Sequence, residues 1–264
     1  MEPRVLQHDE KGDGEPIVLV PGGLTGWLSW IPHQERLAAA RKAIRVQPVH
    51  NELGSRGQLV EADYDDEVER ECFRATLDDL AIDTTDVAAW SGGARAAIEF
   101  SLTYPERIRS LTLIEPPALW ALRDRSPEVD AEIAHLDAFI EWVSGKPTTE
   151  DDLAEFLVMA GFVQDPSEAR AHPMWERWLP HRGALANQGT LGRKARSLEE
   201  AERFERPVLL VKGTRSSTWL GEIVDALGRS YPRATVLDLE GSHACHIERI
   251  DEFLPRLEEH LSNV

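Results

Sequence analysis

Short apolar runs and amphipathic stretches alternate along most of this chain. Apolar runs of the length of a buried strand lie at 16–20, 44–48, 86–90, 108–114, 208–211 and 235–239. Apolar residues with helical spacing lie between them at 34–40, 66–80, 94–104 and 223–227, and after the last one at 252–260. Apolar strands that alternate with helices are typical of a parallel sheet covered on both faces. The pattern therefore predicts an α/β fold with a mostly parallel sheet flanked by helices.

The segment 117–205 interrupts this alternation. It contains no convincing strand, and its apolar residues follow helical spacing at 129–143, 150–160, 175–179 and 198–204. Turn-forming residues separate these stretches at 144–147 and 164–167. We therefore expect a core built from residues 1–116 and 206–264. Residues 117–205 are expected to form a helical cap inserted between two strands, not an independent domain.

Composition and charge limit the classes of partner that the chain is expected to bind. Its 264 residues are 42% hydrophobic and 29% charged, with a net charge of −18 that opposes binding to nucleic acid or to an anionic membrane. No apolar run approaches the roughly 18 residues of a membrane span, and residues 1–4 do not resemble a signal peptide. Two cysteines make no disulfide framework. We expect a cytoplasmic protein, monomeric or homodimeric, without nucleic-acid or membrane partners.

A tight turn between a predicted strand and a predicted helix carries Ser91, in the sequence Ala-Trp-Ser-Gly-Gly of residues 89–93. The small residues Ala89 and Gly93, two positions either side of the serine, allow the turn to close. The free N–H of Gly92, at the helix N-terminus, then points to where an oxyanion would form. This arrangement is typical of a nucleophile elbow. The alternative is an ordinary helix start made of small residues.

Further motifs lie before and after Ser91. They are Val-Leu-Val-Pro-Gly-Gly-Leu at 18–24, Tyr-Pro-Glu-Arg-Ile at 104–108 and Leu-Glu-Gly-Ser-His-Ala-Cys-His at 239–246. With these motifs the chain resembles the α/β-hydrolase-fold superfamily over roughly its whole length, as a serine-nucleophile member with a helical cap. The resemblance implies that Ser91 is the nucleophile.

The resemblance also implies an oxyanion hole made by the backbone N–H groups of Gly23 and Gly92. Pro21 stands where the family usually has a histidine, but the donor is a backbone group and is not lost by this replacement. The alternatives are a plain glycine turn after a strand and, less favoured, a phosphate loop, for which no Gly-Lys-Ser/Thr sequence follows.

His243 matches the position of the family's general base. A serine hydroxyl needs a base to take its proton, and histidine titrates in the useful range. His246 matches a common second histidine with a structural or supporting role. The alternatives are a capping or core histidine and a metal pair. No metal is expected, because the His-x-x-His spacing lacks other ligands at a recognisable spacing.

The sequence departs from the family pattern at the acidic residue that would orient His243. The family's acid commonly lies three residues beyond a glycine, which here is Gly213, but position 216 is Ser216. Some members, including a group of haloalkane dehalogenases, take the acid from the end of the strand after the elbow helix. Glu115 ends that strand, and the following proline restricts its backbone. We therefore assign Glu115 as the acid. The alternative is a solvated residue or a partner of Arg215.

Eight tryptophans suggest an aromatic pocket. Trp27, Trp90, Trp120 and Trp219 lie on predicted loops or strand ends near the candidate site, and we expect them to bind substrate. An apolar, aromatic pocket favours a small hydrophobic substrate. The alternative is that each is simply a core tryptophan.

These inferences together predict a serine hydrolase, carboxylesterase-like, that needs no metal or organic cofactor. It would cleave an ester, thioester, lactone or related carbonyl bond of a small hydrophobic substrate through an acyl-enzyme. Two alternatives stay open. One is a non-catalytic ligand-binding protein, which Pro21 and Ser216 motivate. The other is a lyase or carbon–carbon hydrolase on the same fold.

Overall fold

The computed structural model describes residues 1–190 and 196–263 and contains one sheet of seven strands. The strand order is β1-β3-β2-β4-β5-β6-β7, and every neighbouring pair is parallel except β1 with β3. The strands are β1 (Gln7–Lys11), β2 (Pro16–Val20), β3 (Lys42–Gln47), β4 (Thr85–Trp90), β5 (Ile108–Ile114), β6 (Val208–Gly213) and β7 (Ala234–Leu239). The predicted mostly parallel α/β sheet is confirmed.

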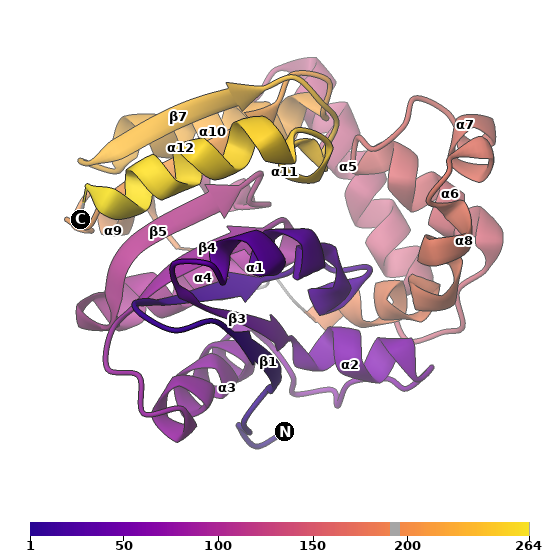
Figure 1. Cartoon of the computed structure of the whole chain (residues 1–264). Helices are drawn as coiled ribbons and strands as arrows, with labels where there is room; N and C mark the ends of the chain where they lie inside the picture. Colours follow the sequence, from indigo (N-terminus) through magenta and orange to yellow (C-terminus); the bar gives the residue numbers. More distant parts are fainter. Residues whose placement is uncertain (191–195, 264) are drawn as a thin grey trace.

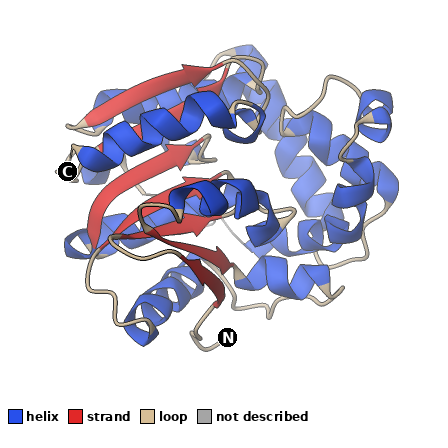
Figure 2. Ribbon diagram, in the orientation of Figure 1, coloured by secondary structure: helices blue, strands red, loops and turns tan. Residues whose placement is uncertain are grey.

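Helices cover both faces of this sheet (Figures 1 and 2). Helices α1 (Ile31–Leu37) and α12 (Ile250–Ser262) pack on one face, and α3 (Asp66–Asp79), α4 (Gly92–Thr103) and α10 (Thr218–Ser230) pack on the other. Alternate residues of β2 belong to the two cores: Ile17 and Leu19 face α1 and α12, whereas Val18 and Val20 face α3 and α4. Burial on both sides explains why the central strands β2, β4 and β5 are largely apolar.

The connection from β5 to β6 is helical in its described residues and lies beyond the carboxyl ends of the strands (Figure 1). Its elements are η3 (Leu119–Ala121), α5 (Pro127–Val143), α6 (Glu150–Met159), α7 (Pro166–Ala171), α8 (Trp175–Trp178), η4 (Leu179–Thr190) and α9 (Leu198–Ala201). Side chains of Ser126, Thr149 and Asp165 cap α5, α6 and α7, as their residue types favour. Residues 191–195 of the predicted cap lie outside the described residues.

The hydrophobic contacts divide this connection into two parts. Its middle, from Phe139 to Leu185, forms a core of its own with Leu24. Its ends join the main core through residues such as Ala118, Val129 and Phe204. The connection is therefore anchored to the sheet at both ends and stands away from it in the middle.

Several elements were not predicted from the sequence. Strand β1 is polar and only partly buried, so it has no apolar alternation to reveal it. Short α2 (Val49–Ser55), α7 and α11 (Cys245–Glu248), together with η1 (Gly26–Trp30), η2 (Pro105–Arg107) and η4, were also missed. None of the helices in the described part of the chain is long and apolar enough to cross a membrane.

Candidate active site

Ser91 lies on a strained turn between β4 and α4. Its φ of 51° and ψ of −127° are unusual for a residue with a side chain. A Cβ at Gly93 would lie 2.1 Å from the Pro21 carbonyl oxygen, and one at Gly22 would lie 3.3 Å from Ser91 Cβ. The turn therefore requires glycine at position 93, and the loop after β2 passes directly against the serine.

Gly23 and Gly92 lie side by side at this turn. A Cβ built on Gly92 would be 3.5 Å from the Gly23 backbone nitrogen. Gly92 begins α4, so its N–H has no partner within the helix. The two residues predicted to form the oxyanion hole thus lie on adjacent backbone segments beside Ser91.

Glu115 follows β5 and is completely buried. Its φ is 43°, and its N–H donates to the Val211 carbonyl at 3.0 Å, which holds it beside the end of β6. Its Oε2 lies 2.5 Å from Nδ1 of His243. This contact fixes the direction of the imidazole and leaves Nε2 as the ring nitrogen free for a proton transfer.

Two further donors hold the Glu115 carboxylate. The Gly213 N–H donates to Oε1 at 2.7 Å, and the Ser216 hydroxyl donates to Oε2 at 2.6 Å. Ser216, at the position where the family commonly has its acid, thus binds the carboxylate that comes from the neighbouring strand. Arg215 instead lies 3.6 Å from Glu248. The alternatives of a solvated Glu115 or an Arg215 partner do not fit this geometry.

The loop that carries His243 is fixed from several directions. The His243 N–H donates to the Gly161 carbonyl at 3.0 Å, and the Trp90 indole N–H donates to the His243 carbonyl at 2.9 Å. The ring of Phe162 meets the imidazole edge to face at 5.2 Å. His246 points elsewhere: it is fully buried among aromatic rings, and burial holds its pKa well below the ordinary value.

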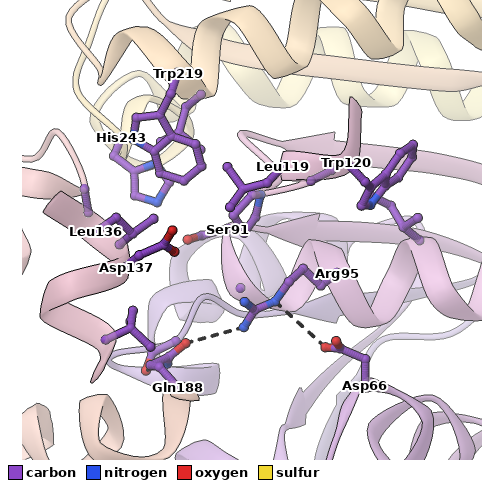
Figure 3. Close-up of a pocket in the computed structure, with 18 of the residues that line it drawn as sticks. Asp66, Ser91, Arg95, Leu119, Trp120, Leu136, Asp137, Gln188, Trp219 and His243 are labelled. Atoms are coloured by element: carbon purple, nitrogen blue, oxygen red, sulfur yellow. Dashed lines mark hydrogen bonds and ion pairs between the residues drawn. The ribbon is translucent and has the colours of Figure 1, made fainter. Parts of the chain in front are cut away.

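A cavity of about 440 Å³ lies at this point, within the usual size range for small-molecule sites. Ser91, Gly23, Gly92 and His243 all line it. Apolar side chains from the β5–β6 connection and from α10 line much of the rest (Figure 3); they include Leu119, Trp120, Leu136, Ile140, Phe156 and Trp219. The cavity can therefore hold a small, largely apolar molecule against the serine.

A model of the alpha/beta hydrolase family matches residues 17–256. The chain belongs to this family. It is similar to 2-hydroxymuconate semialdehyde hydrolase of Pseudomonas sp. strain CF600, with 30% identity over 42% of this chain and 39% of that relative. It is also similar to pimeloyl-(acyl-carrier protein) methyl ester esterase of Aeromonas hydrophila, with 28% identity over 64% of this chain and 67% of the relative. The chain thus spans about two fifths of the length of the first relative.

Several solved structures share the fold of this chain. The esterase of Thermogutta terrifontis has a TM-score of 0.76 and 20% identity, covering 98% of this chain and 93% of that one. The enol-lactonase of Burkholderia xenovorans has a TM-score of 0.72 and 20% identity, covering 97% of this chain and 96% of that one. At this identity the likeness establishes the fold and leaves the substrate open.

The four predicted substrate-binding tryptophans of this alpha/beta hydrolase separate into two pairs. Trp120 and Trp219 line the cavity beside Ser91, whereas Trp27 and Trp90 do not. The Trp27 N–H is held by Gln47 and its ring lies under the Arg45 guanidinium at 5.7 Å, so it faces β3.

Trp90 is the residue before the nucleophile, and its ring belongs to the core on the α1 and α12 face. Alternation along β4 directs it away from the Ser91 cavity. Trp27 and Trp90 thus lie outside the lining of the cavity beside Ser91, and Trp120 and Trp219 remain the predicted substrate-binding tryptophans there.

Four polar side chains that line the cavity were missed in the sequence. Arg95, Asp66, Asp137 and Gln188 all line it. Arg95 offered a signal: it is a cation in the first turn of α4, where the helix dipole disfavours positive charge, and its neighbours in the sequence are alanines. Gln188 and Asp137 come from the β5–β6 connection, so only the fold brings them to the site.

Metal ligands are not gathered at this site. Across residues 1–190 and 196–263, no group of three or more His, Cys, Asp or Glu side chains is arranged to hold a metal ion. The two cysteines, Cys72 and Cys245, are buried and unpaired.

Proposed function

We propose that this chain is a serine hydrolase that cleaves an ester, thioester, lactone or related carbonyl bond of a small hydrophobic substrate through an acyl-enzyme. One observation carries the proposal: Glu115 holds His243 by a 2.5 Å contact to Nδ1, at a cavity that Ser91 also lines. A buried carboxylate, a histidine and a serine on a strained turn are the parts of an acyl-transfer relay.

In this mechanism Ser91 Oγ attacks the carbonyl carbon of the substrate while His243 takes its proton. Glu115 orients the imidazole and stabilises its positive charge. The N–H groups of Gly23 and Gly92 bind the oxyanion, and each such donor typically contributes about 2.7–4 kcal/mol. His243 then protonates the leaving group. Water, deprotonated by the same histidine, hydrolyses the acyl-enzyme and restores Ser91.

The cavity supports the proposed substrate class. Its volume suits a small molecule, and its wall of Leu, Ile, Phe and Trp side chains favours an apolar portion. The names of the relatives also agree with hydrolysis of a carbonyl compound: one is a methyl ester esterase and another a semialdehyde hydrolase. The ester, thioester and lactone substrates are therefore the first to test.

The test is covalent labelling with a fluorophosphonate probe, followed by mass spectrometry of the labelled peptide. We expect the adduct on Ser91 and its loss in Ser91→Ala. Ser101→Ala is the matched control, because Ser101 is a buried serine of α4, the helix that follows Ser91. Its hydroxyl donates to the Ile98 carbonyl, and the residue does not line the cavity. Failure of the folded wild-type protein to label would favour the non-catalytic alternative.

A further inference from the structure

The cavity beside Ser91 has two chemically different ends. In Figure 3, Trp219 and His243 lie on one side of Ser91, and Arg95 lies on the other with Gln188 and Asp66. Arg95 is the only arginine or lysine among the described residues that line the cavity. Asp66, Glu99 and Asp137 also line the cavity, so the suitability of Arg95 for a negative group depends on how these carboxylates are engaged.

The Arg95 guanidinium is poorly satisfied by the residues around it. Its Nη2 donates to the Gln188 side-chain oxygen at 3.4 Å, a long hydrogen bond. Its Nε lies 3.9 Å from Asp66 Oδ1 and has no hydrogen-bond partner among the described residues. The side chain is only 17% exposed, and burial lowers its pKa. Buried donors without acceptors are costly, so an acceptor entering the cavity would be stabilised there.

The guanidinium of Arg95 lies close to where the carbonyl of a substrate would react. A Cβ at Gly92 would lie 3.8 Å from Arg95 Nη2 and 3.5 Å from the Gly23 nitrogen. Gln188, which accepts from Arg95, also donates to the Gly23 carbonyl at 3.2 Å. Arg95 therefore lies beside both glycines of the proposed oxyanion hole. A group bound by Arg95 would be only a few bonds away from the carbonyl under attack.

The acidic side chains that line the cavity do not satisfy all the donors of Arg95. Glu99 is occupied by Arg196, which donates to it at 2.6, 2.9 and 3.0 Å. Asp137 is exposed, so its charge is screened by solvent. Asp66 is the counter-ion of Arg95 but does not meet it in the two-bond geometry that a guanidinium can form with a carboxylate.

We propose that Arg95 binds a carboxylate of the substrate, so that the preferred substrates are esters, thioesters or lactones of short acids that carry a second, free carboxylate. The fork of the guanidinium matches a carboxylate, and the apolar part of the substrate lies toward Trp219. This inference rests on the proposed hydrolase function. It adds that Arg95, which the sequence alone did not single out, determines substrate charge preference.

The test compares two substrates of similar size, phenyl hydrogen glutarate, which is anionic, and phenyl pentanoate, which is neutral. The measured quantity is the ratio of their kcat/KM values after subtraction of buffer hydrolysis. Wild-type protein is expected to favour the anionic ester. In Arg95→Gln we expect the ratio to fall about 10- to 100-fold, because a hydrogen-bonded charge pair is lost. Arg95→Lys keeps the charge but not the fork and should give an intermediate ratio.

Arg41→Gln is the matched control. Arg41 is also 17% exposed and paired with an aspartate, Asp86, but it lies at the opposite end of the sheet. Its loss should leave the ratio unchanged. A purely structural Arg95 would lower both rate constants together, so an unchanged ratio in folded Arg95→Gln would overturn the proposal.

Binding of glutarate to Ser91→Ala, measured by calorimetry, separates this inference from the hydrolase proposal. Glutarate binding that is lost in Ser91→Ala/Arg95→Gln supports the carboxylate site even if no ester is cleaved. Ester cleavage and Ser91 labelling without any preference for the anionic ester would leave the hydrolase proposal standing and refute the carboxylate site.

Discussion

Two buried carboxylates at opposite ends of the sheet have different partners. Asp86 lies near the start of β4 and Glu115 follows the end of β5, and both are completely buried. Asp86 accepts from Arg41 at 3.0 Å, from Arg109 at 2.6 Å and from Ser110 at 2.8 Å. Burial raises its pKa to about 6 against the lowering by Ser110 and Arg41, so it is ionised at neutral pH.

Among the described residues, no arginine donates a hydrogen bond to Glu115. Its donors are the Gly213 N–H, the Ser216 hydroxyl and the imidazole of His243. An arginine stays charged and holds a carboxylate permanently, whereas a histidine can gain and lose a proton near neutral pH. This difference is what the proposed relay requires: Asp86 is paired with permanent cations, whereas Glu115 is paired with a side chain that can exchange a proton.

The largest expected effect is on catalysis, from Glu115→Gln. The amide cannot stabilise an imidazolium and orients His243 wrongly, so kcat should fall by about 10⁴-fold, as in other serine relays. The free energy of unfolding should change little, since no permanent cation loses its partner. The measurement is kcat with phenyl pentanoate together with urea unfolding. Nearly full activity in this variant would show that Glu115 is not the acid.

Asp86→Asn should have the opposite effects, with a large loss of stability and little change in kcat. It leaves Arg41 and Arg109 without their shared carboxylate, and breaking a buried pair in this way costs about 3–5 kcal/mol of unfolding free energy. The kcat of the folded protein should stay close to that of the wild type, because Asp86 is distant from the cavity. Urea unfolding and kcat measured on one preparation check both statements; a stable but inactive variant would contradict the comparison.

Glu69 is a third buried carboxyl group, and its partner is neutral. It accepts a hydrogen bond from the Tyr64 hydroxyl. Burial raises its pKa to about 8. Between pH 4.5, the ordinary pKa of a glutamate, and about pH 8, Glu69 therefore holds a proton in the folded state that it has lost in the unfolded state. The contribution of Glu69 to stability should fall by a few kcal/mol as pH rises through this window. Unfolding free energies across it should show less decline in Glu69→Gln; an identical decline would contradict the assignment.

Ser216→Ala should have the smallest effect. It removes one of the donors to Glu115 while His243 and Gly213 remain, so kcat should fall roughly tenfold or less. Ser217→Ala is the control, because the Ser217 hydroxyl bonds to the Met159 carbonyl at 2.8 Å and not to Glu115. Equal losses in the two variants would mean that Ser216 does not act through Glu115.

The fold was predictable where burial left a strong pattern. Strands β2 to β7 are apolar or partly apolar runs and were found at nearly their observed positions. Edge strand β1 was not, because its residues are polar and its place is fixed by pairing with β3, for example His8 opposite Val46. Pairing between segments distant in the sequence leaves no local pattern in either one.

The candidate site was predictable where it depends on strand ends. Ser91, Glu115 and His243 each follow a strand of a parallel sheet, so the sequence indicated that they could converge. The tryptophans were harder, because a loop position does not reveal direction. Trp120 and Trp219 face the cavity, while Trp27 and Trp90 are held elsewhere by hydrogen bonds and core packing.

The sequence by itself determined the α/β class, the elbow at Ser91 and the presence of Glu115 where a carboxylate could serve, because periodicity and turn chemistry are local. Only the tertiary structure decided that Ser216 holds Glu115 and that Arg95 lies beside Gly23. The first contact depends on the register of β5 with β6, and the second on the pairing of β2 with β4, which brings the loop after β2 beside the start of α4. Both arise from packing between segments distant in the sequence.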